Sequence, residues 1–479
     1  MLNNFVSLFT PGFAETLVYM LQACEYNIPA YLKWIWRVKD FRKVSHRGQL
    51  KRTRYAKILL IFVRVGIALQ ILVGIIFMYL GVRSIIPAGF FIGFAIIAAY
   101  PFLWGHLVIV PLVAGRLLIS DRKATNKIKS AEHVFKNHKA IKIAVLGSYG
   151  KTTMKELLKE ILASDFKVAA TPANKNVAIS HANFAHKLEG KEDILIIEYG
   201  EGAPGDIAKF AKNTHPDYAV ITGLAPAHLD KYPDMHAAAQ DIFSISQYID
   251  PSKIYVNSDS LLCRDHITKD MPVFNSKTAI GWQIQKVNTE VTGSSFSLSK
   301  DKKEFKFETK MIGEHQVAFV AFAAALAIDL GADPKKLAEA VKVTKPFEHR
   351  MQPYQLNGAW IIDDTYNGNI EGIRAGTKLL KQLTAKRKIY VSPGLVDQGI
   401  ENEAVHIEMG KLIAEASPEQ VVLMKNSVTE YIKQGLKNHN FQGKIIVQPD
   451  PLDFYNHLGQ FVAAGDLVVM QNDWPDNYA

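Results

Sequence analysis

The hydrophobic pattern divides the chain into an apolar N-terminal part and a longer part in which short apolar runs alternate with amphipathic stretches. Residues 65–82 contain no charged side chain over 18 positions, and residues 84–115 contain none over 32. A bilayer core about 30 Å thick is crossed by about 20 helical residues. The pattern therefore predicts a transmembrane helical hairpin over residues 57–115, with Pro101 and Pro111 dividing the second stretch.

Beyond residue 140 the apolar runs become short and β-branched and alternate with stretches of helical periodicity. This alternation is typical of parallel strands buried under helices on both faces of a sheet. An evenly alternating stretch over 280–311 predicts a small antiparallel patch, and an Ala-rich helix is expected over 315–330. The expected parallel strands are 141–146, 194–197, 218–221 and 254–256, with helices at 153–162 and 203–211.

A second alternation begins near residue 360, beyond Lys345 and Pro346. Its expected strands are 360–362, 388–391, 420–423, 444–447 and 467–470, with helices at 370–383, 403–415, 428–436 and 451–461. Two α/β domains are therefore expected after the apolar part. The predicted boundaries are a basic, interfacial segment over 1–56, the hairpin over 57–115, a first α/β domain over 116–344 and a second over 345–479.

Basic residues concentrate on both sides of the apolar part. Between residues 33 and 57 there are ten Lys or Arg and a single acid, Asp40, which nearly accounts for the formal net charge of +10. A basic block beside an apolar stretch indicates a membrane surface rather than nucleic acid. By the positive-inside rule, both ends of the hairpin are expected to face the cytoplasm at the inner membrane, with the α/β domains on that side. The basic residues that follow the hairpin are Arg116, Arg122, Lys123, Lys127 and Lys129.

Alternatives stay open for the N-terminal part. The apolar stretches would also suit a buried hairpin of a soluble protein, although the lopsided flanking charge disfavours that interpretation. Residues 13–38 mix Leu, Tyr and Trp with few charges, which fits either an interfacial amphipathic helix or packing against the hairpin. The two cysteines, Cys24 and Cys263, form neither a disulfide framework nor a zinc spacing, which fits a reducing compartment.

The run G-S-Y-G-K-T-T over residues 147–153 follows a predicted strand and opens a predicted helix. Glycines let backbone N–H groups approach phosphate oxygens, and the start of a helix adds partial positive charge. A lysine in this place reaches the β- and γ-phosphates, and the hydroxyl that follows it binds Mg²⁺. The sequence therefore predicts a phosphate-binding loop made of Gly147, Gly150, Lys151, Thr152 and Thr153.

Two further polar side chains follow predicted strands. Glu198 ends the strand over 194–197, and His228 lies a few residues beyond the strand over 218–221. In an open parallel sheet, ligands gather at the carboxyl ends of the strands, and a carboxylate there suits Mg²⁺. Taken singly, Glu198 would equally suit a helix cap, and a lone histidine is more often structural. Their case rests on the phosphate loop nearby.

The order of these motifs resembles that of the Mur ligases, the ATP-dependent enzymes that build the peptidoglycan stem peptide. The resemblance covers roughly residues 140–479 and is closest to the MurF type, which adds D-Ala-D-Ala. Its motifs, in order, are the phosphate loop, N-K-N at 174–176, E-Y-G at 198–200, P-A-H at 226–228, G-E-H at 313–315, Arg350 and D-D-T-Y-N-G-N at 363–369.

The resemblance implies a fold and a reaction. The fold is a P-loop parallel-sheet ATPase domain followed by a Rossmann-like C-terminal domain. In the reaction, ATP phosphorylates a carboxylate, and the amine of an amino acid or dipeptide attacks the acyl phosphate. Lys151, Glu198 and His228 would be catalytic, and Thr152, Glu198 and His228 would hold Mg²⁺. Beyond the phosphate loop, the resemblance assigns the nucleotide to Asn174, Gln316, Arg350 and Asp364.

The sequence departs from the family at three places. Many Mur ligases carry a carbamylated lysine shortly after P-A-H, where this chain has Ala239, so Asp241 or water would have to compensate. The family's second adenine-facing amide corresponds to Phe319, which we expect to stack on the base instead. By the resemblance, the apolar part stands where the family has its N-terminal UDP-sugar domain, so the expected partner is a UDP-linked or a lipid-linked cell-wall precursor.

Other functions remain open at this stage. A polyglutamate-synthase-like ligase is also Mur-related and membrane-anchored, and the D-D-T-Y-N run favours the cell-wall enzyme over it. A non-catalytic, Mur-like membrane scaffold would explain Ala239 and Phe319, but not the intact phosphate loop. A zinc-ribbon ligase that amidates lipid-linked precursors is disfavoured, because the four cysteines that it needs are missing. The sequence identifies neither the carboxylate nor the amine that is joined, nor the oligomeric state.

Overall fold

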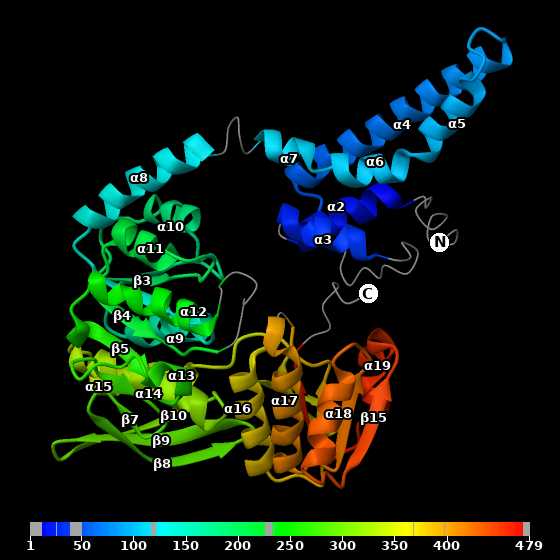
Figure 1. Cartoon of the computed structure of the whole chain (residues 1–479). Coiled ribbons are helices and arrows are strands. Elements are labelled where there is room, and N and C mark those ends of the chain that lie inside the picture. The colour runs from blue at the N-terminus through cyan, green and yellow to red at the C-terminus, as the bar shows by residue number, and fades with distance from the viewer. Residues whose placement is uncertain are drawn as a thin grey trace. The chain divides into compact units, whose positions relative to one another are not determined.

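The computed structural model describes residues 12–24, 26–38, 50–115, 121–225, 232, 234–366, 368–396 and 398–472 (Figure 1). The chain divides into two compact units near residue 124. The first unit is helical and the second contains two sheets. The helices of the first unit are α2 (Phe13–Ala23), α3 (Ile28–Arg37), α4 (Arg54–Val82), α5 (Gly89–Ala98), α6 (Tyr100–Leu107) and α7 (Val110–Gly115).

Helix α4 is a continuous helix of 29 residues and is long and apolar enough to cross a membrane. The second apolar stretch is not one straight helix, because α5 and the segment from Tyr100 to Ala114 are bent by 47°. Pro101 and Pro111 lie at the starts of α6 and α7, which confirms that these prolines divide the stretch. Gln70 of α4 supports the bend, donating to the carbonyl of Ile96 at 2.6 Å and accepting from the Trp104 indole at 2.7 Å.

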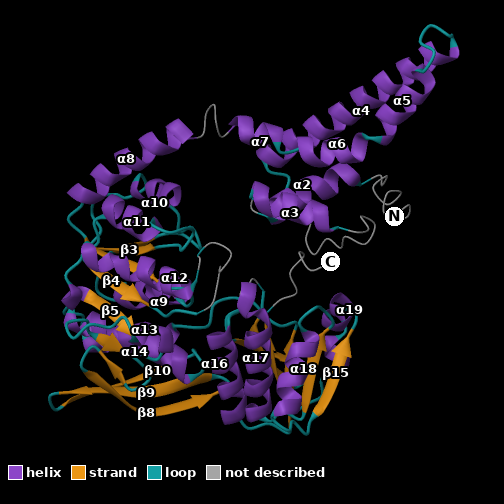
Figure 2. Ribbon diagram, in the orientation of Figure 1, coloured by secondary structure: helices purple, strands orange, loops and turns teal. Residues whose placement is uncertain are grey.

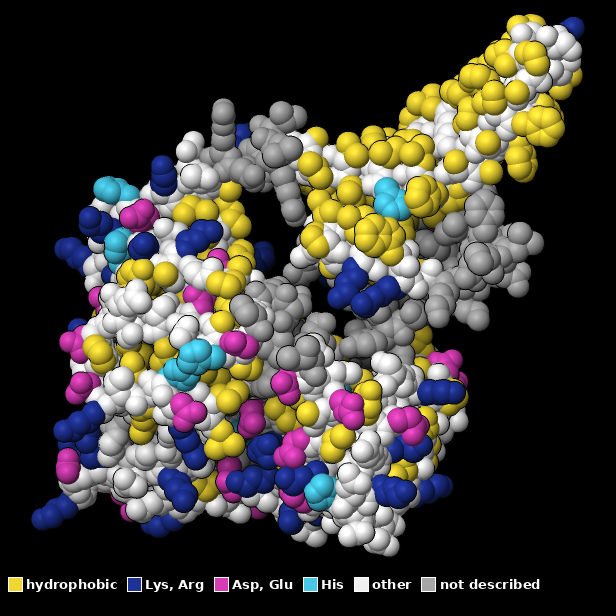
Figure 3. Space-filling model, in the orientation of Figure 1, with side chains coloured by type: hydrophobic (Ala, Val, Ile, Leu, Met, Phe, Trp, Pro, Cys, Tyr) yellow, Lys and Arg dark blue, Asp and Glu magenta, His cyan; other side chains and the backbone are white. Residues whose placement is uncertain are grey.

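Glycines allow α4 and α5 to pack closely. A Cβ on Gly93 would lie 2.3 Å from the Gly74 carbonyl oxygen, and one on Gly81 would lie 2.2 Å from the Phe90 nitrogen. On their outer faces the two helices leave large apolar side chains exposed (Figure 3). A transmembrane location for them stays a prediction.

Within the segment over 13–38, helix α2 packs against α4, and Tyr31 of α3 donates to the Gly105 carbonyl of α6 at 2.8 Å. Almost every side chain of α2 is buried, Leu17 and Leu21 completely. Glu15 of α2 accepts a hydrogen bond from Arg64 of α4 at 2.7 Å, so the one guanidinium between Lys57 and Arg83 has an acidic partner. An interfacial position of this segment at a membrane stays a prediction.

The first sheet of the second unit has ten strands in the order β10-β9-β8-β7-β6-β5-β4-β1-β3-β2 (Figure 2). The strands from β2 to β6 pair in parallel, and those from β6 to β10 pair antiparallel. The expected antiparallel patch is thus confirmed, but it continues the parallel sheet instead of standing alone. The strands are β1 (Ile141–Leu146), β2 (Val168–Ala170), β3 (Ile194–Glu198), β4 (Tyr218–Ile221), β5 (Ile254–Asn257), β6 (Val273–Phe274), β7 (Thr278–Ala279), β8 (Trp282–Glu290), β9 (Gly293–Lys300) and β10 (Lys303–Thr309).

Helices cover both faces of this sheet, as the buried strands require. One face packs against α9 and α14 through residues such as Leu157 and Phe322. The other packs against α10, α11 and α12 through residues such as Phe184, Phe210 and Ile242. The helices of this part are α8 (Asp121–Asn137), α9 (Lys151–Leu162), α10 (Ala178–Ala185), α11 (Asp206–Thr214), α12 (Met235–Phe243), α13 (Leu261–Arg264), α14 (Glu314–Asp329) and α15 (Pro334–Val343), with short 3-10 turns at Ser244–Gln247 and Pro251–Lys253.

The second sheet has six strands in the order β11-β12-β16-β13-β14-β15. All neighbours pair in parallel except β11 and β12, and the expected parallel strands are confirmed. The strands are β11 (Gln352–Leu356), β12 (Ala359–Asp364), β13 (Arg387–Ser392), β14 (Gln420–Met424), β15 (Lys444–Gln448) and β16 (Asp466–Gln471). The helices are α16 (Ile370–Gln382), α17 (Asn402–Ala416), α18 (Thr429–Asn438), α19 (Pro451–Asn456) and α20 (Leu458–Phe461), with a 3-10 turn at Gly399–Glu401.

Local chemistry explains where these elements begin. Asn369 caps α16 by accepting from the N–H groups of Glu371 and Gly372, and Asp234 caps α12 by accepting from Ala237. The sequence pattern missed β11, whose polar alternation is weak, and merged α19 with α20 across His457.

Candidate functional site

The carboxyl ends of three neighbouring strands bring the candidate motifs together. Strand β1 lies between β3 and β4, and Val145 of β1 pairs with both Glu198 and Val220. The loop after β1 therefore meets the segments that follow β3 and β4, although these are about fifty and seventy residues away along the chain. This edge is where ligands of open parallel sheets bind.

The loop at residues 147–150 needs both of its glycines. Gly147 and Gly150 have φ angles of +137° and +74°, which residues with a Cβ atom rarely adopt. A Cβ on Gly147 would lie 2.5 Å from the Thr222 hydroxyl, and one on Gly150 would lie 2.7 Å from the Phe319 ring. The loop is fixed to β4 by the Ser148 N–H, which donates to the Gly223 carbonyl at 2.7 Å. Helix α9 begins at Lys151, so its free N–H groups face this loop.

The carboxylate of Glu198 is 1% exposed and is held from several directions. Its Oε1 atom accepts from the Thr152 hydroxyl at 3.1 Å and from the Asn176 amide at 3.2 Å. Its Oε2 atom lies 3.3 Å from the Lys155 ammonium and receives no hydrogen bond from the described residues. Thr152 and Glu198, both expected to bind Mg²⁺, are thus adjacent. Hydroxyl and carboxylate oxygens of this kind fit Mg²⁺.

Sequence reasoning missed Lys155. Its side chain is completely buried, pairs with Glu156 and Glu198 at 3.1 and 3.3 Å, and donates to the Ala173 carbonyl. The available signal was its spacing, because a residue four positions after Lys151 lies on the same face of the helix.

Lys151 folds back over the loop. Its ammonium donates to the Gly147 carbonyl and lies 3.3 Å from Glu201 Oε1. Glu201 follows β3 and was not among the expected site residues.

The expected second part of the metal site is only partly described. His228 lies in residues 226–231, outside the described residues. Ala239 is 3% exposed in the apolar packing of α12. Asp241, expected to compensate for it, accepts from the Gly205 N–H at 2.8 Å and from the Tyr232 hydroxyl at 2.9 Å. Among the described residues, no three His, Cys, Asp or Glu side chains form a ready metal cage.

A buried histidine beneath the site stays neutral. The Nε2 atom of His181 lies 2.8 Å from the Glu198 carbonyl oxygen, and burial lowers the pKa of the imidazole to about 4. We infer that His181 donates a hydrogen bond from Nε2 to the Glu198 carbonyl and thereby holds the end of β3 in place.

The expected nucleotide residues fall into two groups. Asn174 donates to the Tyr366 hydroxyl at 3.3 Å, and the Arg350 guanidinium lies 4.4 Å from the Tyr366 ring centre, so these three residues come together. Gln316 is 7% exposed, and its Oε1 atom receives no hydrogen bond from the described part of the chain. Phe319 lies buried against Gly150 and Phe274, so the structure does not support stacking on a base.

Asp364 is engaged in the second sheet. Its Oδ1 atom accepts from the Met351 N–H at 3.2 Å, and its Oδ2 atom accepts from the Gln471 amide at 2.8 Å. Burial outweighs these hydrogen bonds and raises the pKa of the carboxyl to about 7. Asp364 therefore supports the end of β12, next to the Arg350 segment.

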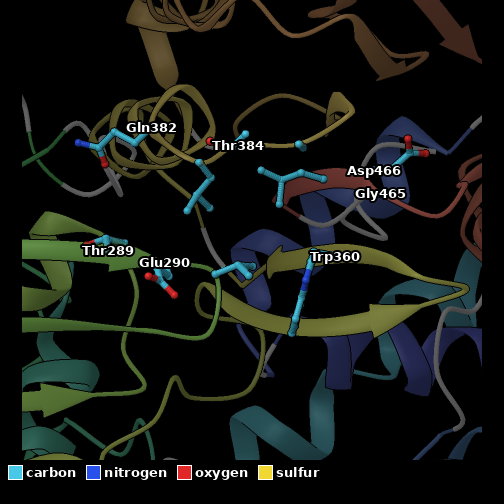
Figure 4. A pocket seen from close by; sticks show the side chains of 11 residues that line it. Thr289, Glu290, Trp360, Gln382, Thr384, Gly465 and Asp466 are labelled. Carbon is cyan, nitrogen blue, oxygen red and sulfur yellow. The ribbon is translucent and has the colours of Figure 1, made fainter.

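A cleft of about 290 Å³ lies elsewhere in the second unit (Figure 4). Its lining includes Trp360, Ala385 and Asp466, which lie at or beside the first residues of β12, β13 and β16, respectively. It therefore opens where the parallel strands start, whereas the phosphate loop lies where the strands of the first sheet end. Ligands of such sheets bind at the carboxyl ends, so this cleft is not the candidate site.

Removing the Lys155 charge should destabilise the protein. Lys155→Met leaves the buried Glu198 carboxylate without its cation, which costs about 3–5 kcal/mol of unfolding free energy. Denaturant unfolding of the full-length protein measures this loss, and adding Glu198→Gln should recover part of it. The control is Lys159→Met on the same helix, whose side chain is 50% exposed and whose loss should cost under about 1 kcal/mol. Equal losses in the two variants would contradict the buried ion pair.

Asp364 should link stability to pH. Its pKa is raised from 3.8 to about 7 on folding, so the folded state holds this proton more tightly. The resulting stability is complete below pH 3.8 and is lost as the pH rises through 7. We expect the unfolding free energy of the wild type to fall relative to that of Asp364→Asn across this window. The relative fall should be on the order of 1–3 kcal/mol, since the group is partly solvated. Parallel pH profiles of the two proteins would contradict the raised pKa.

Comparison with known proteins finds relatives of one kind. Residues 145–327 match the model of the Mur ligase middle domain. The UDP-N-acetylmuramoyl-tripeptide–D-alanyl-D-alanine ligase of Mycobacterium tuberculosis is 26% identical over 294 residues, covering 59% of this chain and 58% of the relative. The Bacillus subtilis ligase of the same name is 24% identical over 335 residues, covering 69% and 72%. This chain thus spans less than two thirds of the mycobacterial relative.

Solved structures share the fold. MurF from Acinetobacter baumannii superposes with a TM-score of 0.64 at 19% identity, covering 74% of this chain and 78% of that one. The MurF ligase from Thermotoga maritima in complex with ADP gives 0.63 at 22% identity, covering 73% and 80%. Residues 145–327 therefore match the Mur ligase middle domain, and over a longer stretch the chain is similar in sequence and in fold to ligases of the MurF type.

Proposed function

We propose that this chain is an ATP-dependent, ADP-forming acid–amino-acid ligase of peptidoglycan precursor synthesis. The observation that carries the proposal is the convergence of Lys151, Thr152 and Glu198 at the end of β1 and β3. The mycobacterial and Bacillus relatives are named for D-Ala-D-Ala ligation, and the Thermotoga relative binds ADP. We infer the same step for this chain, or a related addition of an amino acid or dipeptide.

The proposed reaction has two steps. A carboxylate oxygen of the precursor attacks the γ-phosphorus of ATP, and the bond from that phosphorus to the bridging oxygen breaks, releasing ADP. The amine nitrogen then attacks the acyl carbon, phosphate leaves with the former carboxylate oxygen, and the ammonium gives its proton to phosphate or water. Both steps need charge neutralisation and alignment of the reacting atoms.

This chain's residues would supply those needs. The N–H groups of the loop at 147–150 and Lys151 bind the phosphates, and Thr152 and Glu198 hold Mg²⁺. His228 joins them by family resemblance. Mg²⁺, when bound, neutralises phosphate charge. Arg350 contacts phosphate from the side of the second sheet. Tyr366 contacts both Arg350 and Asn174 and thereby positions their side chains. We assign ATP binding to residues 116–344 and closure over the nucleotide to residues 345–479.

We further propose that the N-terminal unit anchors the enzyme in the inner membrane, with the catalytic part on the cytoplasmic side. Helix α4 exposes a row of large apolar side chains that water would not favour, and basic residues precede it (Figure 3). Arg64, near its start, is paired with Glu15, which reduces the cost of a charge close to the bilayer. An enzyme anchored in this way has access to a lipid-linked precursor as well as to a UDP-linked one, and we propose these two as its substrates.

Ligation is tested with full-length protein, ATP, Mg²⁺, D-Ala-D-Ala and either a UDP-linked or a lipid-linked muramoyl tripeptide. We expect ADP release that depends on both substrates and a product heavier by the dipeptide residue in mass spectrometry. Lys151→Ala should abolish both signals, because it removes the cation that holds the phosphates. Turnover with glutamate instead of the wall substrates would favour the polyglutamate-synthase-like alternative. An absence of turnover with the whole panel would favour the scaffold.

Anchoring is tested by alkaline extraction of cell membranes. The full-length wild type should stay in the membrane pellet. Leu69→Arg with Leu72→Arg in α4 should release it, because each arginine costs about 2.5–3.5 kcal/mol inside a bilayer. Leu261→Arg with Leu262→Arg is the matched control, since these leucines are also exposed but lie in the second unit. Extraction of the wild type, or equal retention of both variants, would refute the anchor.

A further inference from the structure

Lys151 and Glu201 form a buried ion pair at the edge of the first sheet where the phosphate loop lies. The two charged atoms are 3.3 Å apart, and the side chains are only 13% and 6% exposed. Charges removed from water in this way interact more strongly than surface pairs, and either charge is costly to leave alone. Glu201 therefore holds Lys151 firmly while no nucleotide is bound.

Binding of a triphosphate must change this pair. Lys151 is the cation of the loop, and its ammonium bonds to the loop's own Gly147 carbonyl. When Lys151 turns to the phosphates, Glu201 is left as a buried carboxylate beside several negative charges. That arrangement is unfavourable unless another cation takes the place of the lysine.

A divalent cation is well placed to do so. The metal-binding oxygens expected from the sequence, on Thr152 and Glu198, are on the same edge, and Glu201 follows Glu198 by three residues. Mg²⁺ is usually bound by one or two carboxylates together with substrate phosphates and water. Before the phosphates arrive such a site is incomplete, which agrees with the lack of a three-ligand cage among the described residues.

The other nearby acid is less suitable. The Asp241 carboxylate is bound at one oxygen by the Gly205 N–H and at the other by the Tyr232 hydroxyl. Neither partner is a cation that a nucleotide would attract away. Glu201, in contrast, loses its partner in the event that brings phosphate to the site. The side chain of Ala239 has no oxygen that could bind a metal.

We propose that Glu201 is a metal-binding residue of this enzyme, which pairs with Lys151 before the nucleotide binds and passes to Mg²⁺ when the nucleotide takes Lys151. The proposal rests on the proposed binding of ATP. It assigns Glu201 the anionic role that Ala239 cannot fill. It also predicts that nucleotide affinity depends more strongly on Mg²⁺ than it would if the phosphate loop bound the nucleotide without Glu201.

The test is titration calorimetry of the full-length protein with AMP-PNP, in excess EDTA and in excess MgCl₂. In wild type, Mg²⁺ should strongly increase the affinity. In Glu201→Gln, the affinity in EDTA should rise, because Lys151 is released and a repelling charge is gone. The affinity in MgCl₂ should fall, so that the increase due to Mg²⁺ shrinks by about tenfold or more.

Controls separate the possible outcomes. Glu201→Asp keeps a carboxylate and should retain part of the Mg²⁺ effect, and Glu132→Gln, an exposed acid on α8, should retain all of it. Asp241→Asn tests the rival acid. An unchanged Mg²⁺ effect in a folded Glu201→Gln, or its loss in Asp241→Asn alone, would overturn the assignment of Glu201. A wild type that fails to bind AMP-PNP under both conditions would instead refute the proposed ATP binding.

Discussion

Glu198 ends β3 almost without exposure to water, and its carboxylate has to be matched by groups from several segments. Thr152 and Lys155 reach it from the first turns of α9, and Asn176 reaches it from the segment after β2. The parallel pairing of β1 with β3 makes this possible, because it sets both strand ends at one level. The phosphate loop, the start of α9 and the segment carrying Glu201 are all positioned by this arrangement.

Much of the fold could be predicted because its signals are local. Short apolar runs gave the parallel strands, and Pro101 and Pro111 gave the breaks in the second apolar stretch. The phosphate loop could be located for a similar reason, since Gly147 and Gly150 adopt backbone angles that few other residues tolerate. Thr152 and Glu198 lie together because the carboxyl ends of parallel strands meet at one edge, and their roles at a metal stay a prediction.

What could not be predicted depends on contacts between distant residues. Nothing near Glu201 in the sequence indicates that it meets Lys151, and the engagement of Asp241 by Tyr232 depends on how α12 packs. Phe319 was expected at a base, but lies under Gly150, because α14 is buried along almost its whole length. The strand β11 is polar enough to resemble a loop until β12 is beside it.

The position of β16 has a consequence for how the protein is made. This strand is the last one along the described part of the chain, yet it lies in the middle of the second sheet, between β12 and β13. While the ribosome is still adding residues 466–471, the two halves of that sheet have no common neighbour. Closure of the second sheet must therefore wait until residues 466–471 have been synthesised, whereas the strands around the phosphate loop are all synthesised more than two hundred residues earlier. A premature stop codon shortly before β16 would leave the loop's own sheet intact and would remove the centre of the other.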